Sequence, residues 1–390
     1  MLILYALLMR FPDKGLEKEK ILEELEKLQK KNWSFSSGRI FGSMCAMPLD
    51  VSTIAYNLFI ESNLGNPGLY PATAAMERKV IEMVGDLLHG KKIHGRVLSG
   101  GTEANITALW MYRNMLGKKE VLLPLHAHFS FKKACNLLGL KPVFVKLCAD
   151  YTLDVADLKK KISEKSLCAV AVAGSTELGV VDKIQEIGEI CATRNLPLHV
   201  DAAFGGFVIP FLKAMGHELP DFDFSVEGVT SITVDPHKMG QSVMPSGILL
   251  TKENYWKHIE FSAPYLTSEV QSTLLGTRAS GAVAGTYAAI RYLGFSGYLN
   301  TVKRCMELTE HACKLAKKHC IEPVIEPVMN ILALKVKNAR KVVKALHSKQ
   351  FFVSYGELTD SLRLVLMPYI KQKDIEKLFK TGIVPIVKKN

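Results

Sequence analysis

Short apolar segments alternate with segments of helical periodicity from about residue 74 onward, and this alternation constrains the fold more than any other feature of the chain. A short run of apolar and β-branched residues between turn residues indicates a buried strand, whereas apolar residues three or four positions apart indicate a helix. When the two alternate, the strands pair in parallel and helices cover both faces of the sheet. We therefore predict an α/β fold. The strand-like segments are VLSGG, EVLLPL, PVFVKL, LCAVAVAGS, PLHVDAAFGG, SITVDPHK and GILLT.

The two ends of the chain have a different organisation. Residues 16–31 place Leu22, Leu25 and Leu28 on one side of an amphipathic helix. A long helical segment at about 296–319 is followed by strand, helix, strand, strand and helix patterns, which indicates a compact α+β unit. We predict three parts, namely an N-terminal helical segment with a loop (1–62), a large domain (63–294) and a small C-terminal domain (295–390).

The composition excludes several classes of partner. The formal charge of +12 comes from lysines scattered over helical segments, and no basic run is interleaved with aromatic residues, so we predict no nucleic-acid partner. The opening MLILYALLMR is apolar over only nine residues, too few to span a bilayer, so we predict no membrane contact. The eight cysteines form no C-x-x-C pair, which favours free thiols in a reducing cytoplasm.

Lys238 ends the strand-like segment SITVDPHK and directly follows His237. By itself, this pattern also fits a strand end with an exposed lysine. A lysine that forms an imine needs a neutral amine at working pH, which burial and nearby positive charge can achieve. His237 is placed to donate a hydrogen bond to a phosphate. Lys238 is therefore a candidate Schiff-base residue.

Two further strand ends carry residues suited to a phosphorylated ring. Asp201, followed by small alanines, fits either a helix N-cap or a carboxylate that keeps a pyridine nitrogen protonated. The segment SGGTEAN at 99–105 stands between a strand and a helix, where backbone N–H groups and the hydroxyl of Thr102 would bind an anion. The segment is neither a Walker loop nor a dinucleotide fingerprint.

Histidines follow another of the strands. His126 and His128 are spaced like a pair of metal ligands but lack a third ligand, so we predict no metal site and favour stacking of His128 on an aromatic ring. Thr176 is placed to contact a ring substituent. Because the ends of parallel strands share one rim, these groups are expected to meet there. Together they predict a site for pyridoxal 5'-phosphate.

The ordered motifs resemble those of group II pyridoxal-phosphate-dependent amino-acid decarboxylases, and most closely those of the archaeal L-tyrosine/L-aspartate decarboxylase family. The likeness covers about residues 16–385. It implies fold type I, in which a large domain holds the cofactor on a mostly parallel seven-stranded sheet flanked by helices. The matching segments are FGSMCAMPL, NLGNPGLYP, SGGTEAN, AHFSF, AGSTELG, HVDAAFGGFVIPF, DPHKMG, APYLT and LGTR.

The resemblance also implies a role for each matching residue. Lys238 would form the Schiff base with the cofactor, Asp201 would pair with the pyridinium nitrogen, and His128 would stack on the ring face opposite Ala203. The family forms homodimers with shared active sites, so Gly276 and Thr277 would reach the partner's cofactor. The other implied cofactor-binding residues are Gly100, Gly101, Thr102, Thr176, Asp235 and His237.

Substrate-binding residues follow from the same resemblance. Arg363 would hold the α-carboxylate of the amino acid, and Arg278 would be the cation for a distal carboxylate. Distant relatives use a tyrosine on a mobile loop as proton donor, and Tyr265 is the nearest candidate here. The expected lining segments of the substrate pocket include Ser43, Met44, Cys45 and Tyr70.

The archaeal family decarboxylates aspartate to β-alanine for coenzyme A or tyrosine to tyramine, and some relatives accept glutamate. We favour aspartate on family grounds. The alternatives are a carbon–carbon lyase of the sphingosine-phosphate type, an aminotransferase and a non-enzymatic protein that binds pyridoxal phosphate.

Overall fold

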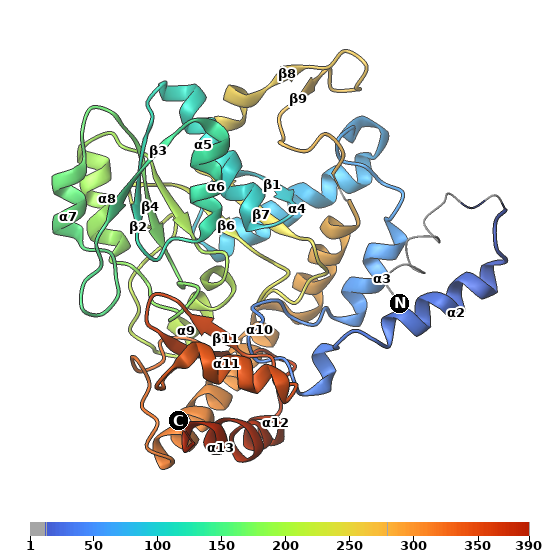
Figure 1. Cartoon of the computed structure of the whole chain (residues 1–390). Coiled ribbons are helices and arrows are strands. Elements are labelled where there is room, and N and C mark those ends of the chain that lie inside the picture. The colour runs from blue at the N-terminus through green and yellow to red at the C-terminus, as the bar shows by residue number, and fades with distance from the viewer. Residues whose placement is uncertain (1–11, 13, 279, 390) are drawn as a thin grey trace.

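The computed structural model describes residues 12, 14–278 and 280–389, and it is built around one large sheet (Figure 1). The seven strands lie in the order β1-β7-β6-β5-β4-β2-β3, and β7 is antiparallel to both of its neighbours while the other pairs are parallel. The predicted α/β class and the mostly parallel seven-stranded sheet are therefore confirmed. The strands are β1 His94–Leu98, β2 Glu120–Pro124, β3 Lys141–Val145, β4 Ser166–Val172, β5 Leu198–Asp201, β6 Val229–Val234 and β7 Gly247–Thr251.

Helices cover both faces of this sheet, as β4 illustrates. Every residue of β4 is buried, because successive side chains point to opposite faces and both faces are covered. Val170 packs with α5 and α6 on one face, whereas Ala169 and Ala171 face the core beneath the other helices. The helices of the large domain are α4 Pro71–Leu87, α5 Gly101–Leu116, α6 Phe129–Leu138, α7 Val155–Lys161, α8 Ile184–Thr193 and α9 Ile209–Ala214.

The C-terminal part follows the predicted order of helix, strand, helix, strand, strand and helix. Its first helix is the second half of α10 (Ser280–Lys318), which is broken at Gly294, where a φ of 56° is not helical, so the predicted start near residue 296 agrees with the structure. The strands form a three-stranded antiparallel sheet in the order β10-β12-β11. The other elements are β10 Ile331–Lys335, α11 Ala339–Ser348, β11 Ser354–Gly356, β12 Ser361–Val365, α12 Gln372–Lys377, a π-helical turn Leu378–Ile383 and α13 Val384–Val387.

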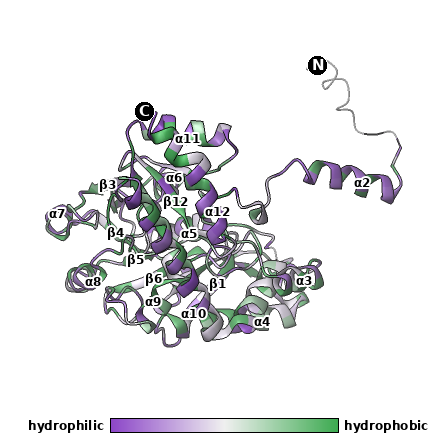
Figure 2. Ribbon diagram, turned by 90° about the horizontal axis from the view of Figure 1, so that it is seen from below, coloured by the Kyte–Doolittle hydropathy of each residue, from purple (hydrophilic) through white to green (hydrophobic). Residues whose placement is uncertain are grey.

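The N-terminal part includes α2 (Lys18–Gln29) and α3 (Asp50–Leu58). The predicted amphipathic helix is α2, but none of its residues is buried, and it extends away from the body of the molecule (Figure 2). A short hairpin, β8 (Phe261–Ser262) and β9 (Val270–Gln271), also lies at the periphery (Figure 1). Across the part of the chain that the structure describes, no helix has both the length and the apolar character needed to cross a bilayer. The opening segment MLILYALLMR lies outside that part.

Candidate active site

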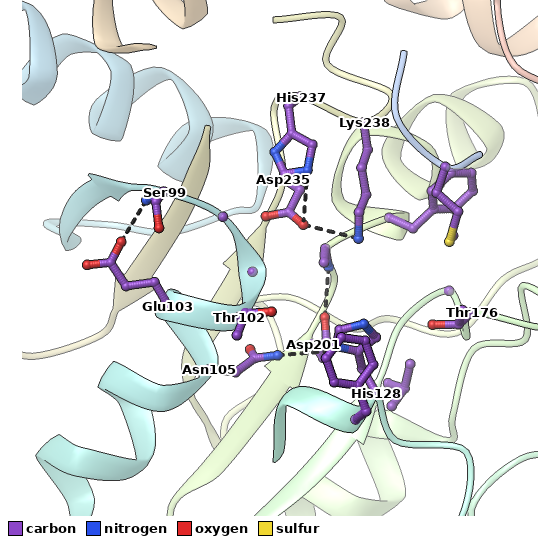
Figure 3. Close-up of a pocket in the computed structure, with 18 of the residues that line it drawn as sticks. Ser99, Thr102, Glu103, Asn105, His128, Thr176, Asp201, Asp235, His237 and Lys238 are labelled. Atoms are coloured by element: carbon purple, nitrogen blue, oxygen red, sulfur yellow. Dashed lines mark hydrogen bonds and ion pairs between the residues drawn. The ribbon is translucent and has the colours of Figure 1, made fainter. Parts of the chain in front are cut away.

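A cavity of about 340 Å³ opens at the carboxyl ends of the parallel strands (Figure 3). Loops that follow β1, β2, β4, β5 and β6 form its wall, which is the common rim that the sequence predicted. The predicted cofactor-facing residues meet here, although they are far apart in the sequence. The lining residues include Met44, Gly100, Gly101, Thr102, His128, Thr176, Asp201, Ala203, Asp235, His237 and Lys238.

The start of α5 provides a place for an anion. Its first backbone N–H groups have no partner within the helix, and its N-cap residue is Gly100, at a φ of 142° that glycine tolerates. A Cβ atom at Gly101 would lie 2.9 Å from Oδ2 of Asp235, so a side chain there would close the approach to the helix start. The hydroxyl-bearing Thr102 also lines the cavity. These features fit a phosphate group.

Lys238 is largely buried, and its Nζ atom lies 3.1 Å from Oδ2 of Asp235 (Figure 3). Burial acts to lower the pKa of Lys238, but the charges of Asp235 and Asp201 outweigh burial and raise the pKa above its usual value. From the sequence we predict that the amine of Lys238 is neutral and lies beside positive charge. The structure corrects that expectation, since carboxylates are the close neighbours and they favour the ammonium form in the free protein.

Asp201 ends β5 and is held from two directions. Its Oδ1 atom accepts a hydrogen bond from the backbone N–H of Ala203 at 3.1 Å, and its Oδ2 atom accepts one from Nδ2 of Asn105 at 3.2 Å. Both Asp201 and Asn105 are buried. Such a fixed carboxylate is suited to pair with a protonated ring nitrogen.

His128 caps the N-terminus of α6, where its Nδ1 atom accepts from the backbone N–H of Ser130 at 3.3 Å. Burial lowers the pKa of His128 and the charge of Asp201 only partly opposes this, so the neutral ring is favoured. The other histidine, His126, contacts the buried carboxylate of Asp182 at 3.0 Å. Among the described residues, no three His, Cys, Asp or Glu side chains are grouped so that they could hold a metal ion.

Cys45 adjoins the lining residue Met44, and the sequence placed it in a lining segment. Burial raises the pKa of its thiol, but a hydrogen bond with His237 and the charges of His237 and Lys238 together outweigh burial, so the pKa is below its ordinary value. Burial likewise lowers the pKa of His237, and the contacts with Cys45 and Asp235 raise it above the usual value. His237 is thus partly engaged by a thiol, in addition to the phosphate contact predicted for it.

Arg363 lies in the middle of β12, with 5% of its surface exposed. Its Nη1 atom donates to the carbonyl oxygen of Gly42 at 3.2 Å, whereas its Nε and Nη2 atoms have no partner among the described residues. Burial lowers the pKa of Arg363 to about 10. The hydroxyl of Tyr369 is also buried without a partner, and the sequence did not single it out. A buried guanidinium with free donors is suited to bind a carboxylate.

Other predicted residues lie outside the cavity of this chain. Tyr265 follows β8 and is 86% exposed, and Gly276 and Thr277 are also exposed. Tyr70 precedes α4 and does not line the cavity. Ser43 is next to the lining residue Met44, and its hydroxyl accepts from the backbone N–H of Cys45 at 3.1 Å.

Arg278 is placed differently from the sequence prediction. Its guanidinium is buried against the carboxylate of Glu77 and also donates to the backbone oxygens of Val97 and Leu64. These contacts use both terminal nitrogens, so Arg278 joins the loop before α10 to α4 and β1. The prediction that it binds a distal substrate carboxylate is therefore wrong.

Comparisons with known proteins show which family model and which relatives the chain matches. Residues 8–337 match the family model described as the pyridoxal-dependent decarboxylase conserved domain. The chain is 46% identical to the L-aspartate/L-glutamate decarboxylase of Pyrococcus horikoshii, over 95% of this chain and 98% of that protein. It is 42% identical to the L-aspartate decarboxylase of Thermococcus kodakarensis, over 95% and 97%. Identity to the L-tyrosine/L-aspartate decarboxylase of Methanocaldococcus jannaschii is 39%, over 94% and 97%.

Solved structures share the fold at lower identity. The sphingosine-1-phosphate lyase of Burkholderia pseudomallei superposes with a TM-score of 0.87 at 24% identity, over 98% of this chain and 94% of that one. The glutamate decarboxylase of Lactobacillus brevis gives a TM-score of 0.85 at 18% identity, over 98% and 95%. These likenesses confirm the predicted fold type I architecture.

Proposed function

The chain belongs to the pyridoxal-dependent decarboxylase family, and from this premise we propose that it converts L-aspartate to β-alanine and CO₂, the β-alanine serving coenzyme A synthesis. The observation that carries the proposal is the meeting of Lys238, Asp201 and the start of α5 around one cavity. The buried Arg363 donates to the carbonyl oxygen of Gly42, two residues before the lining residue Met44, and keeps free donors. The names of the relatives from Pyrococcus and Thermococcus support aspartate as the substrate.

The cofactor is pyridoxal 5'-phosphate, and the residues of the cavity fit each of its functional groups. The N–H groups at the start of α5, with Thr102 and His237, would hold the phosphate. Asp201 would hold the protonated ring nitrogen, and Lys238 would bind the carbonyl carbon. When bound, the cofactor supplies an electron sink for the electron pair that remains when CO₂ leaves.

The protein residues provide orientation and a suitable electrostatic environment. The negative charge of Asp201 would favour a proton on the ring nitrogen, and two hydrogen bonds hold its carboxylate in place. Arg363 would bind the substrate's α-carboxylate through its free Nε and Nη2 donors, in a buried place where such contacts are strong. His128 and Ala203 both line the cavity, and they would bound the proposed ring site on its two faces. The fixed orientation selects the bond to the carboxylate for cleavage.

The choice between substrates rests on the relatives. Because Glu77 engages Arg278, that arginine does not supply a cation for the distal carboxylate of aspartate. L-Tyrosine remains the second candidate, since relatives from Methanosphaera stadtmanae and Methanocaldococcus jannaschii are named for both amino acids. L-Glutamate is a third, because the Pyrococcus horikoshii protein is also named for it.

We further propose a homodimer with shared active sites. The apolar row of α2 is exposed, with Leu22 at 48% and Leu28 at 56%, and a second copy of the chain would cover it. The exposed loop around Gly276 and Thr277 would reach the partner's cofactor, and Tyr265 would serve there as the proton donor. The eight cysteines are free, which supports a cytoplasmic location.

The direct experiment measures CO₂ release from aspartate, glutamate, tyrosine and cysteine by the protein loaded with pyridoxal phosphate. We expect the highest kcat/KM with aspartate and an absorbance band of the bound cofactor in the visible or near-ultraviolet region. Keto-acid formation without CO₂ would instead identify an aminotransferase, and cleavage of a phosphorylated amino alcohol would identify a lyase. A colourless protein that binds no cofactor would refute the proposal.

A further inference from the structure

Asn105 lies within the second turn of α5, is 1% exposed and contacts three functional regions at once. Its Nδ2 atom donates to Oδ2 of Asp201 at 3.2 Å and to Oγ of Ser130 at 3.0 Å. Its Oδ1 atom lies 3.0 Å from Nε2 of His199. Figure 3 shows its amide directed at Asp201. One side chain therefore joins the carboxylate of the cavity, the serine beside His128 and a histidine buried in the sheet.

The direction of each hydrogen in this network follows from the carboxylate. An ionised Asp201 only accepts hydrogen bonds, so the NH₂ group of Asn105 must face it and the amide oxygen must face His199. His199 then donates from Nε2. Burial lowers the pKa of His199 to about 4, so the ring is neutral and its Nδ1 atom accepts from the hydroxyl of Ser231 at 2.6 Å. The amide of Asn105 is thus held in one orientation.

The second amide hydrogen of Asn105 orients the hydroxyl group that contacts His128. Because Oγ of Ser130 accepts from Asn105, its own hydrogen is available to donate to Nδ1 of His128, 2.9 Å away. The backbone N–H of Ser130 also donates to that Nδ1 atom, at 3.3 Å. Two donors on Nδ1 leave the proton of the neutral ring on Nε2. Asn105 therefore orients the hydroxyl of Ser130 as one of the two donors that favour this tautomer, and the backbone N–H is the other.

We propose that Asn105 is a positioning residue, which sets the orientation of the Asp201 carboxylate and, through the hydroxyl of Ser130, strengthens the preference of the His128 ring for its Nε2–H tautomer. Its amide geometry links two groups that reach the cavity from different elements, β5 and the start of α6. The inference rests on the proposed function, since Asp201 and His128 would contact the cofactor only if the ring binds between them. It adds a role for a residue that does not itself bind the substrate.

The network has two branches, one from Asn105 to Asp201 and one from Asn105 through Ser130 to His128. Three variants separate them. Asn105→Leu removes both amide donors and keeps a side chain branched at Cγ. Ser130→Ala removes only the hydroxyl that joins Asn105 to His128. Thr107→Val is the matched control, because Thr107 is fully buried on the same helix and its hydroxyl has no partner among the described residues. The first readout is the ¹⁵N NMR signal of the His128 ring, measured in histidine-labelled protein with and without pyridoxal phosphate. A His128→Gln sample assigns the signal.

We expect the wild type and Thr107→Val to show the Nε2–H tautomer of His128, and Asn105→Leu and Ser130→Ala to show a mixture of tautomers. In Asn105→Leu the dissociation constant of pyridoxal phosphate should rise about tenfold or more, since a charge-assisted hydrogen bond to Asp201 is lost. We expect kcat to fall roughly 10- to 100-fold with a change in KM of less than about threefold.

The proposal is overturned if Asn105→Leu and Ser130→Ala both retain the wild-type tautomer and bind the cofactor as the control does, even if they unfold at lower temperature. If Asn105→Leu does not fold, Ser130→Ala decides the branch to His128. Asn105→Asp then decides the other branch, because two adjacent carboxylates should weaken cofactor binding steeply as pH rises, unlike in the wild type. If the wild type binds no pyridoxal phosphate, the proposed function fails, but the tautomer in the cofactor-free protein still decides this inference.

Discussion

The network around Asp201 on the large domain and the buried Arg363 on the small domain differ in how completely their polar groups are paired. On the large domain, Asp201, Asn105 and His199 form a closed network in which each polar side chain has a partner. On the small domain, Arg363 and Tyr369 are buried with donors that lack partners among the described residues. A paired network stabilises the free protein, whereas unpaired buried donors cost stability until a ligand binds them. The Asp201 network is therefore built in advance, whereas a bound carboxylate would complete the contacts of Arg363.

The largest effect is expected from Lys238→Ala, because it removes the proposed covalent attachment of the cofactor. Turnover should fall at least about 1000-fold, and the absorbance band of the attached cofactor should disappear. Since Asp235 would lose its buried partner, we also expect the free protein to lose roughly 1–3 kcal/mol of unfolding free energy. Denaturant titration and a CO₂ assay measure the two effects.

Lys238→Arg is the matched control, because it keeps a positive charge beside Asp235 without a primary amine. It should be as inactive as Lys238→Ala but retain more of the stability. Full activity in Lys238→Ala would disprove the proposed chemistry.

Arg363→Met should lower activity without lowering stability, whereas Lys238→Ala should lower both. We expect kcat/KM for the amino acid to fall about 100-fold or more, because the buried partner of the α-carboxylate is lost. The free protein should keep its stability or gain about 1–2 kcal/mol, since a buried charge with unpaired donors is replaced by an apolar side chain.

The same two assays test this second prediction, and Arg340→Met on the exposed face of α11 provides a surface control. A clear loss of stability in Arg363→Met, with little effect on turnover, would mean that Arg363 is a structural residue. The comparison between the Asp201 network and Arg363 would then be wrong.

The buried His199, which belongs to the Asp201 network, makes the stability of the protein sensitive to acid. Burial lowers its pKa in the folded protein to about 4, whereas the unfolded chain has the ordinary value near 6.5. The unfolded state therefore binds more protons between these values, so stability is lost as the pH falls through this window. We expect a loss of about 2 kcal/mol from this group between pH 7.5 and pH 5.

His199→Gln keeps a donor for Asn105 but cannot titrate, so its unfolding free energy should vary less with pH over this range. Urea titrations of both proteins at several pH values measure the difference. Parallel curves would show that His199 does not carry the acid sensitivity.

The smallest effect concerns the thiol that contacts His237. Because the pKa of Cys45 is lowered, we expect iodoacetamide at pH 7 to alkylate it at least about tenfold faster than Cys191, whose pKa burial raises to about 12. Peptide mass spectrometry after timed labelling gives both rates in one sample. Equal rates would mean that His237 does not activate the thiol.

The sequence by itself determined the fold class and most of the polar residues that line the candidate cavity. Lys238, Asp201 and the SGGTEAN segment follow strands of a parallel sheet, and the ends of such strands share one rim. The motif also contained Asn105, which stands three residues, about one helical turn, beyond Thr102. That spacing placed it on the same face of the helix, but no local pattern indicated its partners.

Only the tertiary structure decided which polar groups are paired. Glu77 engages Arg278, and Asn105 engages His199, across long separations in the sequence that leave no periodic signal. The same holds for the close carboxylate that favours the ammonium form of Lys238 and for the free donors of Arg363. Strand and helix patterns arise from local backbone geometry and burial, whereas hydrogen-bond partners depend on how distant segments pack. The chemistry of the site was therefore predictable from the sequence in outline, and its electrostatics were set by the packing.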